Sequence, residues 1–471
     1  MMNSLLIRTL LRFPAKELGN FCDYVHCPMF NRRAEVTRLC DYLAGALHKS
    51  DRKALDAERL FAAAFPGRAF DVAALRHVMS YLLEAARQYL SLMEWRADLP
   101  GQQRYLIRAL HHLGLETMAE KEWRGAKAMT ENAEVQDAQY HFGLYQLHQE
   151  QLERTARQGR SGFVDLRPLP DALTVFYMAE MLRHACSALS HQAIAGQAHH
   201  FEWLERILQT LESAELSQTP VVAVYLQTYK MLSSAESEPF DRLKGMLVQY
   251  ERRFSREELR SLYLLAINGC IRRMNAGQRA YIREAFELYR AALERDFLTD
   301  NGLLSGFTYK NIIRIGVALG EHVWTEAFLE RYREALHPRE RDNMYLYNLA
   351  FLHFQQHDYA RAMPLLRQVD LDDTLNNLDA RRMLLRSYFE LGEWQALESL
   401  LQSFAVYLRR QKNLGYHRIS NEKLLYFTKK LMVIDRSDQK SLSRVLAEID
   451  GTGEVAERVW LRRLAGGEAT P

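Results

Sequence analysis

The sequence predicts an all-α protein, an irregular α-solenoid of stacked helical hairpins that follows a small helical N-terminal unit. Three observations predict this class: helical hydrophobic period in nearly every long segment, few turn residues, and a hairpin-sized segment that recurs. The 471 residues contain only 11 prolines and 23 glycines. An all-β or α/β chain of this length would need more of both, because each hairpin or crossover requires turn residues.

The segment 71–93 gives the clearest helical period. Its apolar residues recur at three- and four-residue steps, which places them on one face of a helix. They are Leu75, Val78, Met79, Leu82, Leu83, Ala86, Tyr89, Leu90 and Met93. Asp71 precedes this stripe and has the side chain of a typical N-cap. The pattern therefore predicts a long helix that begins at Asp71.

Two breaks divide the chain into three predicted parts. A helical N-terminal unit, 1–98, ends at Asp98–Gly101, and a helical middle segment follows over 99–158. The second break, 156–171, contains two glycines, two prolines and three arginines, too many helix breakers for a helix. The third predicted part is a tetratricopeptide-like helical array over 171–464.

The C-terminal half contains an internal repeat. HDYARAMPLLRQV at 357–369 matches GEWQALESLLQSF at 392–404, 35 positions later, and Trp324 precedes Tyr359 by the same interval. In AFELYRAALE, 285–294, small and large side chains alternate on one helical face. Such a face packs against two neighbouring helices, because the alanines allow close approach and the large side chains fill the space beside them.

Residues 255–410 resemble the tetratricopeptide repeat, a helical hairpin of about 34 residues. The first-helix matches are Leu349 with Ala350, Leu384 with Leu385, His353 and Tyr388. The second-helix matches are Asp358 with Tyr359, Glu393 with Trp394, and the buried alanines Ala285, Ala327 and Ala362. LGEHVW, 319–324, departs from the pattern because it is two residues longer than LGEW, 391–394. The resemblance implies stacked hairpins whose curved surface binds peptides, proteins or other subunits.

The N-terminal region resembles the start of large uncharacterised helical proteins of Bacteroidetes bacteria. The matching residues are Pro28, Phe30, Asn31, Leu39 and Leu43, followed by Phe65, Pro66 and Gly67. They cover less than a quarter of the chain, and this resemblance implies no activity.

Charge and cysteine usage favour a cytoplasmic protein. A formal net charge of +3, from 62 basic and 59 acidic residues, argues against a dedicated nucleic-acid binder, which would carry a strong basic excess. The five cysteines are odd in number and irregularly spaced, which favours a reducing compartment. Arg8 and Arg12 interrupt the first apolar run, so we expect no signal peptide. No apolar run approaches the roughly 18 residues of a membrane span, and we expect no membrane contact.

The sequence motifs predict neither a catalytic centre nor a cofactor. H-E-x-x-H, Walker-type and dinucleotide-type glycine loops and the nucleophile elbow G-x-S-x-G are missing from the sequence. Cys22, His26, Cys27 and Cys40 raise the question of a metal, but C-x4-C is not a familiar zinc spacing. We predict no metal site and leave the role of these cysteines open. An enzyme with a site near the 156–171 loop remains an alternative, which requires convergent polar groups there.

The leading functional prediction is a non-catalytic protein-binding scaffold whose partner is another protein or a second copy of the chain. The expected contacts lie on first helices, which line the inner surface of helical stacks. They are Tyr309, Asn311, Arg314, Tyr345 and Asn348. The alternative is a nucleic-acid-associated protein that uses the basic and aromatic segment 407–418. Its expected contacts are Arg409, Arg410, Lys412 and Arg418.

Overall fold

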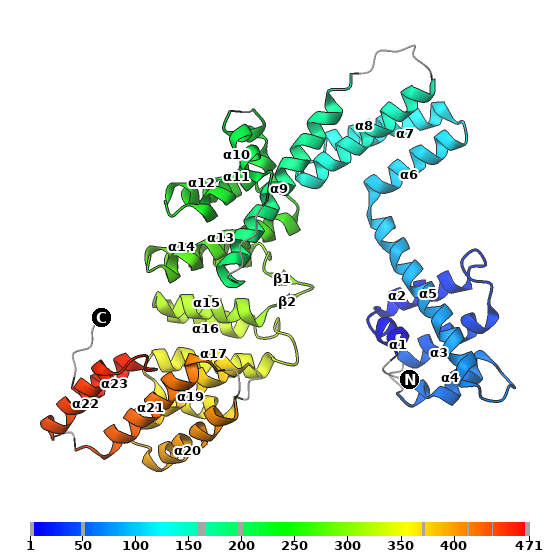
Figure 1. Ribbon diagram of the computed structural model, residues 1–471. Helices are drawn as coiled ribbons and strands as arrows, with labels where there is room; N and C mark the ends of the chain where they lie inside the picture. The colour runs from blue at the N-terminus through cyan, green and yellow to red at the C-terminus, as the bar shows by residue number, and fades with distance from the viewer. Residues whose placement is uncertain are drawn as a thin grey trace. The chain divides into compact units, whose positions relative to one another are not determined.

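The computed structural model describes residues 4–48, 52–158, 165–195, 201–213, 215–369, 373–411, 414–435 and 437–466. Within these ranges the fold is all-α, as predicted: α-helices dominate, and the only strands are a pair of two residues each (Figure 1). The chain divides into two compact units, Met1–Met178 and Ala179–Pro471, and the division falls inside the helix α9, Pro168–Ala195. The three predicted parts of the chain remain a prediction.

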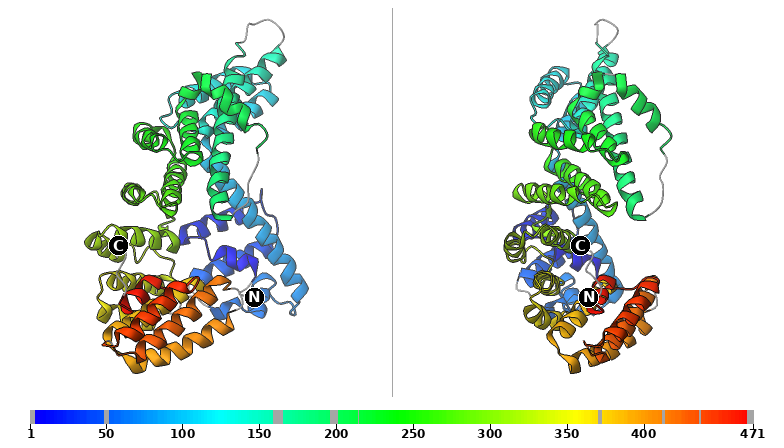
Figure 2. Two further views of the ribbon diagram at one scale, coloured as in Figure 1. Left: turned by 60° about the vertical axis from the view of Figure 1, so that its left-hand side comes forward. Right: turned by 90° about the vertical axis from the view of Figure 1, so that its left-hand side faces the viewer.

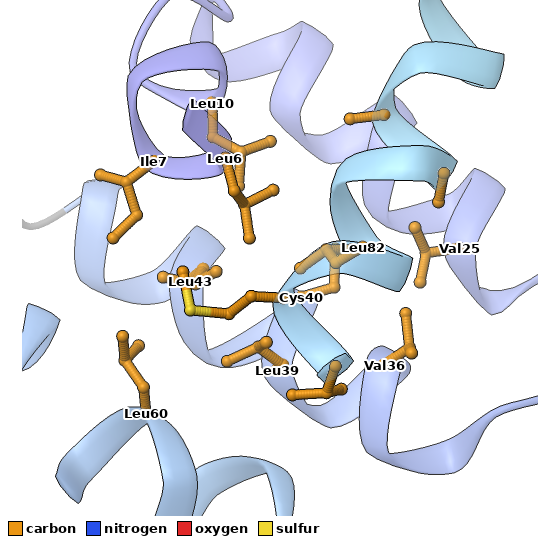
Figure 3. Packing of buried hydrophobic residues seen from close by; sticks show 14 of the residues in the cluster. Leu6, Ile7, Leu10, Val25, Val36, Leu39, Cys40, Leu43, Leu60 and Leu82 are labelled. Carbon is orange, nitrogen blue, oxygen red and sulfur yellow. The ribbon is translucent and has the colours of Figure 1, made fainter. Parts of the chain in front are cut away.

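The first unit begins with a group of helices around a leucine-rich core. These are α1 (Leu5–Leu10), α2 (Ala15–His26), α3 (Ala34–His48), the 3-10 helix η1 (Arg52–Leu55), α4 (Ala57–Ala64) and α5 (Val72–Ala97). Figure 3 shows the apolar side chains of several of these helices packed together, with Cys40 among them. The predicted start of α5 is confirmed, because the Asp71 carboxylate accepts a hydrogen bond of 2.8 Å from the Ala73 N–H.

The first unit continues with three helices that share a smaller core. They are α6 (Leu99–His112), α7 (Glu116–Glu131) and α8 (Ala138–Gln158). The Trp123 indole packs between α6 and α8 and donates a hydrogen bond of 2.9 Å to the Leu147 carbonyl. Asp98 separates α5 from α6 and caps α6 by accepting a 2.9 Å hydrogen bond from the Gly101 N–H. The predicted helix break at Asp98 is therefore present.

The second unit consists of helices that pair in chain order (Figures 1 and 2). After α9 come α10 (Leu204–Ser213), the 3-10 helix η2 (Glu215–Gln218), α11 (Pro220–Ser233), α12 (Glu238–Gln249), the 3-10 helix η3 (Glu251–Arg253), α13 (Arg256–Asn275), α14 (Ala280–Glu294), the strands β1 (Thr299–Asp300) and β2 (Leu303–Leu304), α15 (Gly306–Ala318), α16 (His322–Arg331), α17 (Arg341–Gln355), α18 (Tyr359–Gln368), α19 (Thr374–Leu391), α20 (Trp394–Arg410), α21 (Tyr416–Val433), α22 (Gln439–Gly451) and α23 (Arg458–Leu464).

Five helical hairpins follow one another in the second unit. They are α11–α12, α13–α14, α15–α16, α17–α18 and α19–α20, and each also contacts the hairpin that follows it. The short strands β1 and β2 pair antiparallel between α14 and α15, with Thr299 opposite Leu304. This succession of hairpins is compatible with a helical repeat protein, as the sequence predicted.

The turns inside four of these hairpins share one backbone conformation. Gly277, Gly320, His357 and Gly392 have φ values of 88°, 76°, 59° and 72°, in the left-handed region. A residue in this conformation ends a helix, because it lets the next N–H groups bond back to the last carbonyls. His357 and Gly392, which the sequence comparison placed at equivalent positions, therefore have equivalent roles.

The buried alanines of the repeat pattern are confirmed at two positions and wrong at the third. Ala285 and Ala362 are fully buried, but Ala327 on α16 is exposed, and Thr325 takes the buried position instead. The reason is that α16 begins two residues after the left-handed Gly320, just as α18 begins two residues after His357. The predicted match of Trp324 to Tyr359 is therefore displaced by two residues.

Candidate partner-binding groove

A pocket of about 420 Å³ opens on the second unit between α9, α11, α13 and α15. We call it the α13–α15 groove. Its lining residues are Leu189, Ser190, Leu232, Asn268, Ile271, Arg272, Met274, Asn275, Phe307, Asn311, Arg314 and Ile315. On α13 and α15 these residues recur at steps of three and four, because positions at that spacing share one helical face. The groove is therefore built mainly from two neighbouring first helices.

The polar lining of the groove consists of amides, a hydroxyl and two guanidinium groups. The Asn268 side-chain amide donates a 3.0 Å hydrogen bond to the Ser190 hydroxyl, which fixes α13 against α9. Arg272 is exposed and forms no ion pair with another residue in the described part of the chain. The lining contains no carboxylate. The groove is therefore positively charged and offers hydrogen-bond donors and acceptors.

Phe307 gives the groove an exposed apolar edge. Its side chain lies on the first turn of α15 and is 74% exposed, the largest exposure of any phenylalanine in the described residues. The turn is held by Ser305, whose hydroxyl accepts a 3.1 Å hydrogen bond from the Thr308 N–H. An aromatic ring on a capped helix end is held in position without being packed, which suits it to contact a partner.

Arg314 connects the groove to a half-buried polar cluster. Its guanidinium donates a 2.7 Å hydrogen bond to the Tyr347 hydroxyl, forms an ion pair with Asp379, and lies 4.1 Å from the centre of the Phe351 ring. Arg382 also donates to the Asp379 carboxylate, at 3.1 Å. Burial raises the pKa of Asp379, but Arg314, the Tyr347 hydroxyl and Arg382 together hold it below its usual value. The Asp379 carboxylate therefore stays ionised and keeps Arg314 in place.

Lys310 lies one helical turn before Arg314 and belongs to the same positive region. Its ammonium group donates to the Asn376 side-chain carbonyl on α19. Burial and the positive charge of Arg314 lower the pKa of Lys310, while Asp379 and Asp373 oppose this effect. Lys310, Arg314 and Arg382 thus place three cations near the half-buried Asp379 carboxylate.

The structure brings two of the five predicted partner contacts to the groove. Asn311 and Arg314 line it. Tyr309 is fully buried, and its hydroxyl donates a 2.9 Å hydrogen bond to the Leu329 carbonyl of α16. Asn348 is also fully buried and donates to the Met344 carbonyl of its own helix at 2.7 Å. Tyr345 is 8% exposed and bonds to Glu330. Tyr309 and Tyr345 thus join neighbouring helices, whereas the bond of Asn348 stays within α17.

Ten groove residues were not among the predicted contacts, and four of them have amide, guanidinium or aromatic side chains: Asn268, Arg272, Asn275 and Phe307. Asn268, Arg272 and Asn275 recur at steps of four and three on α13, which is visible in the sequence. The same spacing describes any solvated helix face, so it does not single out a groove. Only the packing of α9 and α15 beside α13 turns this face into a pocket wall.

The predicted nucleic-acid contacts lie at the end of α20 and in the turn that follows. Arg409 and Arg410 occupy the last turn of α20, where cations complement the negative end of the helix dipole. The Arg418 guanidinium donates to the Gln411 carbonyl, so it caps the same helix end. Lys412 lies outside the described residues.

The other two candidate regions of the sequence were the 156–171 loop and the N-terminal cysteines. Part of the 156–171 loop, residues 159–164, lies outside them, and beside it Arg167 pairs with Asp165 at the surface. All five cysteines are thiols, and Cys22 and Cys40 face each other. Across the described ranges, no cluster of three or more His, Cys, Asp or Glu residues is arranged to hold a metal ion.

The described helices include none that combines the length and the apolar character required to cross a membrane. Comparisons of the chain with protein-family models, with curated proteins and with solved structures found no match.

Proposed function

We propose that this protein is a non-catalytic binding scaffold, a tetratricopeptide-like α-solenoid that holds a peptide segment of a partner protein in the α13–α15 groove. The observation that carries the proposal is the composition of the groove. A 420 Å³ pocket with an exposed phenylalanine, three asparagines and two arginines, but no carboxylate, fits a peptide better than it fits a reaction centre.

The asparagines supply the contacts that an extended peptide needs. Each side-chain amide has both donors and an acceptor, so it can pair with the N–H and C=O groups of a backbone in any sequence. Asn268 and Asn275 lie on the same face of α13, two turns apart, and Asn311 lines the groove from α15. A row of amides across two helices would therefore fix the direction of a bound segment.

Phe307 and Arg272 would determine which peptide sequences the groove prefers. Aromatic and arginine side chains carry much of the binding energy at protein interfaces. An exposed Phe307 favours an apolar side chain in the peptide, and the exposed Arg272 favours a carboxylate beside it. The expected ligand is a segment with one large apolar residue next to an acidic residue.

The proposal is tested with a displayed library of random peptides selected against the full-length protein. Binding of the selected peptides is then measured by fluorescence anisotropy for Phe307→Ala and Arg272→Ala. Each variant should weaken binding by about tenfold or more, which corresponds to about 1.4 kcal/mol.

Matched controls are Val323→Ala, which removes an 86% exposed side chain on α16, and Arg279→Ala, which removes an exposed arginine outside the groove. Both controls should bind like the wild-type protein. If the library yields no acidic, apolar peptide, or if the groove variants bind as tightly as the controls, the proposal is wrong.

A further inference from the structure

Two cysteines from different helices of the first unit face each other. Cys22 lies on α2 and Cys40 on α3, and their Sγ atoms are 3.5 Å apart although the residues are 18 positions apart in the chain. One turn along the same helix pair, the His26 Nε2 atom lies 2.8 Å from the Asp41 carboxylate. A second contact between the two helices thus lies beside the thiol pair.

The distance between the sulfur atoms is short enough for a disulfide to form with little movement. A disulfide bond is about 2.0 Å long, so the sulfurs need to approach by roughly 1.5 Å. A rotation of one cysteine side chain with a small helix shift supplies this. The core around them restricts larger movements, because Cys40 is only 1% exposed and packs among Leu39 and Leu43 (Figure 3).

The two thiols differ in access to solvent and in acidity. Cys22 is partly exposed, whereas Cys40 is buried. The hydrogen bond from the Cys40 thiol lowers the pKa of Cys22, and His26 adds to this effect against burial, Asp41 and Asp23. Burial raises the pKa of Cys270 to about 12 and also raises that of Cys186. Cys22 is therefore more reactive than these two buried thiols, because the thiolate is the nucleophile.

We propose that Cys22 and Cys40 form an oxidation site at which a hydroperoxide converts the two thiols into a disulfide that clamps α2 to α3. In the first step the Cys22 thiolate attacks the O–O bond of hydrogen peroxide. An S–O bond forms, the O–O bond breaks, and the released hydroxide takes up a proton to become water. Cys22 is thereby oxidised by two electrons to the sulfenic acid, and the peroxide is reduced.

In the second step the Cys40 sulfur attacks the sulfenic sulfur of Cys22. The S–S bond forms, the S–O bond breaks, and the departing hydroxide takes the proton of the Cys40 thiol to give a second water. Cys40 suits this resolving role, since it is out of reach of solvent but in contact with Cys22. A dithiol reductant returns both residues to thiols.

The disulfide would change the stability of the N-terminal helices more than their structure. It joins two helices that already pack together, and it closes a loop of 18 positions in the unfolded chain. Cross-links of this kind act mainly by restricting the unfolded state. The oxidised protein should therefore melt at least about 5 °C higher than the reduced protein in the transition of the first unit.

The test treats the full-length protein with equimolar hydrogen peroxide and maps its disulfides by mass spectrometry. Trypsin separates the peptide that carries Cys22 and Cys27 from the peptide that begins at Leu39, and chymotrypsin then cuts after Tyr24 to separate Cys22 from Cys27. The expected product links Cys22 to Cys40 and forms about tenfold faster than any oxidation of Cys186 or Cys270.

Three variants complete the test. In Cys40→Ser the sulfenic acid of Cys22 should accumulate and be trapped by dimedone, in Cys22→Ser no fast oxidation should occur, and Cys27→Ser should behave like the wild type. The proposal is overturned if Cys22 pairs with Cys27, or if Cys22 and Cys40 oxidise no faster than the buried cysteines. The wild-type mapping needs no substitution, so it decides the question even if the Cys40 variant fails to fold.

Discussion

Arg314 on α15 forms an ion pair with Asp379 on α19, two hairpins further along the chain. The hairpin between them contributes Tyr347 on α17, whose hydroxyl donates a 2.5 Å hydrogen bond to the same carboxylate. Three successive first helices are therefore linked by one half-buried polar cluster. Because Arg314 also lines the α13–α15 groove, the cluster couples the packing of the hairpins to the shape of the proposed binding surface.

Asp379→Asn should lower the free energy of unfolding at neutral pH. It should also make that free energy depend less on pH in the acid range. The pKa of Asp379 is lower in the folded protein than the usual value of an aspartate, so its ionisation stabilises the fold above that usual value, and this contribution is lost as the pH falls through the lowered pKa. Removing the charge leaves Arg314 partly unpaired, which should cost about 2 kcal/mol at pH 7. Urea unfolding at pH 7 and near pH 3 measures the difference.

The control for this variant is Asp342→Asn, which breaks an exposed pair with Arg333. Exposed pairs contribute little, so Asp342→Asn should unfold like the wild type at both pH values. Equal effects of the two substitutions would contradict the structural role of the Asp379 cluster.

Arg273→Met should destabilise the second unit strongly. Arg273 is 5% exposed, and its guanidinium donates to the carbonyls of Met231, Ser234 and Glu236 at 2.9, 3.0 and 3.1 Å. One side chain thus satisfies the C-terminal end of α11 and the turn after it, and its loss should cost about 3 kcal/mol.

Thermal and urea unfolding of Arg273→Met are compared with those of Arg272→Met, the neighbouring arginine in the groove. Arg272→Met should keep wild-type stability, because its side chain is exposed. If the Arg273 variant is as stable as the Arg272 variant, the prediction is wrong, and water would then bond to the carbonyls of Met231, Ser234 and Glu236.

The sequence predicted the fold class and much of the hairpin pattern, since both depend on helical period and on small buried residues such as Ala285 and Ala362. It failed at Ala327, because a shift of two residues turns a side chain by about 200° around the helix axis. The sequence pattern also did not determine which face of α15 lines the groove. The helical period placed Tyr309 and Asn311 on one helix, but only the packing of α15 shows that Tyr309 is buried and Asn311 lines the groove.

Gly316→Ala should destabilise the α15–α16 hairpin. A Cβ atom at Gly316 would lie 2.3 Å from the Thr325 hydroxyl oxygen, which is itself held by a 2.7 Å hydrogen bond to the Glu321 carbonyl. The β-branched Thr325 has little freedom to move away, so we expect a loss of about 2 kcal/mol. Thermal unfolding measures it.

The control for Gly316→Ala is Gly245→Ala on α12, where an added Cβ meets nothing within 4 Å. That substitution should raise stability by about 0.5 kcal/mol, because alanine restricts the unfolded chain. Thr325→Ala combined with Gly316→Ala should recover part of the loss. If Gly316→Ala is as stable as Gly245→Ala, the prediction that α15 and α16 approach closely at Gly316 is wrong.

His357→Gly should stabilise the protein, while Gly392→Ala should destabilise it, although the two residues occupy equivalent turns. Both have positive φ, which costs a side-chain-bearing residue about 1 kcal/mol relative to glycine. At Gly392 an added Cβ would meet only the Trp394 ring, at 3.8 Å, so its cost comes from the backbone and should be about 1 kcal/mol. At His357 the gain should be smaller, about 0.5 kcal/mol, because the exposed 3.0 Å hydrogen bond to the Tyr359 hydroxyl is lost. Opposite shifts of the melting temperature are expected, and shifts of the same sign would mean that the two turns are not equivalent.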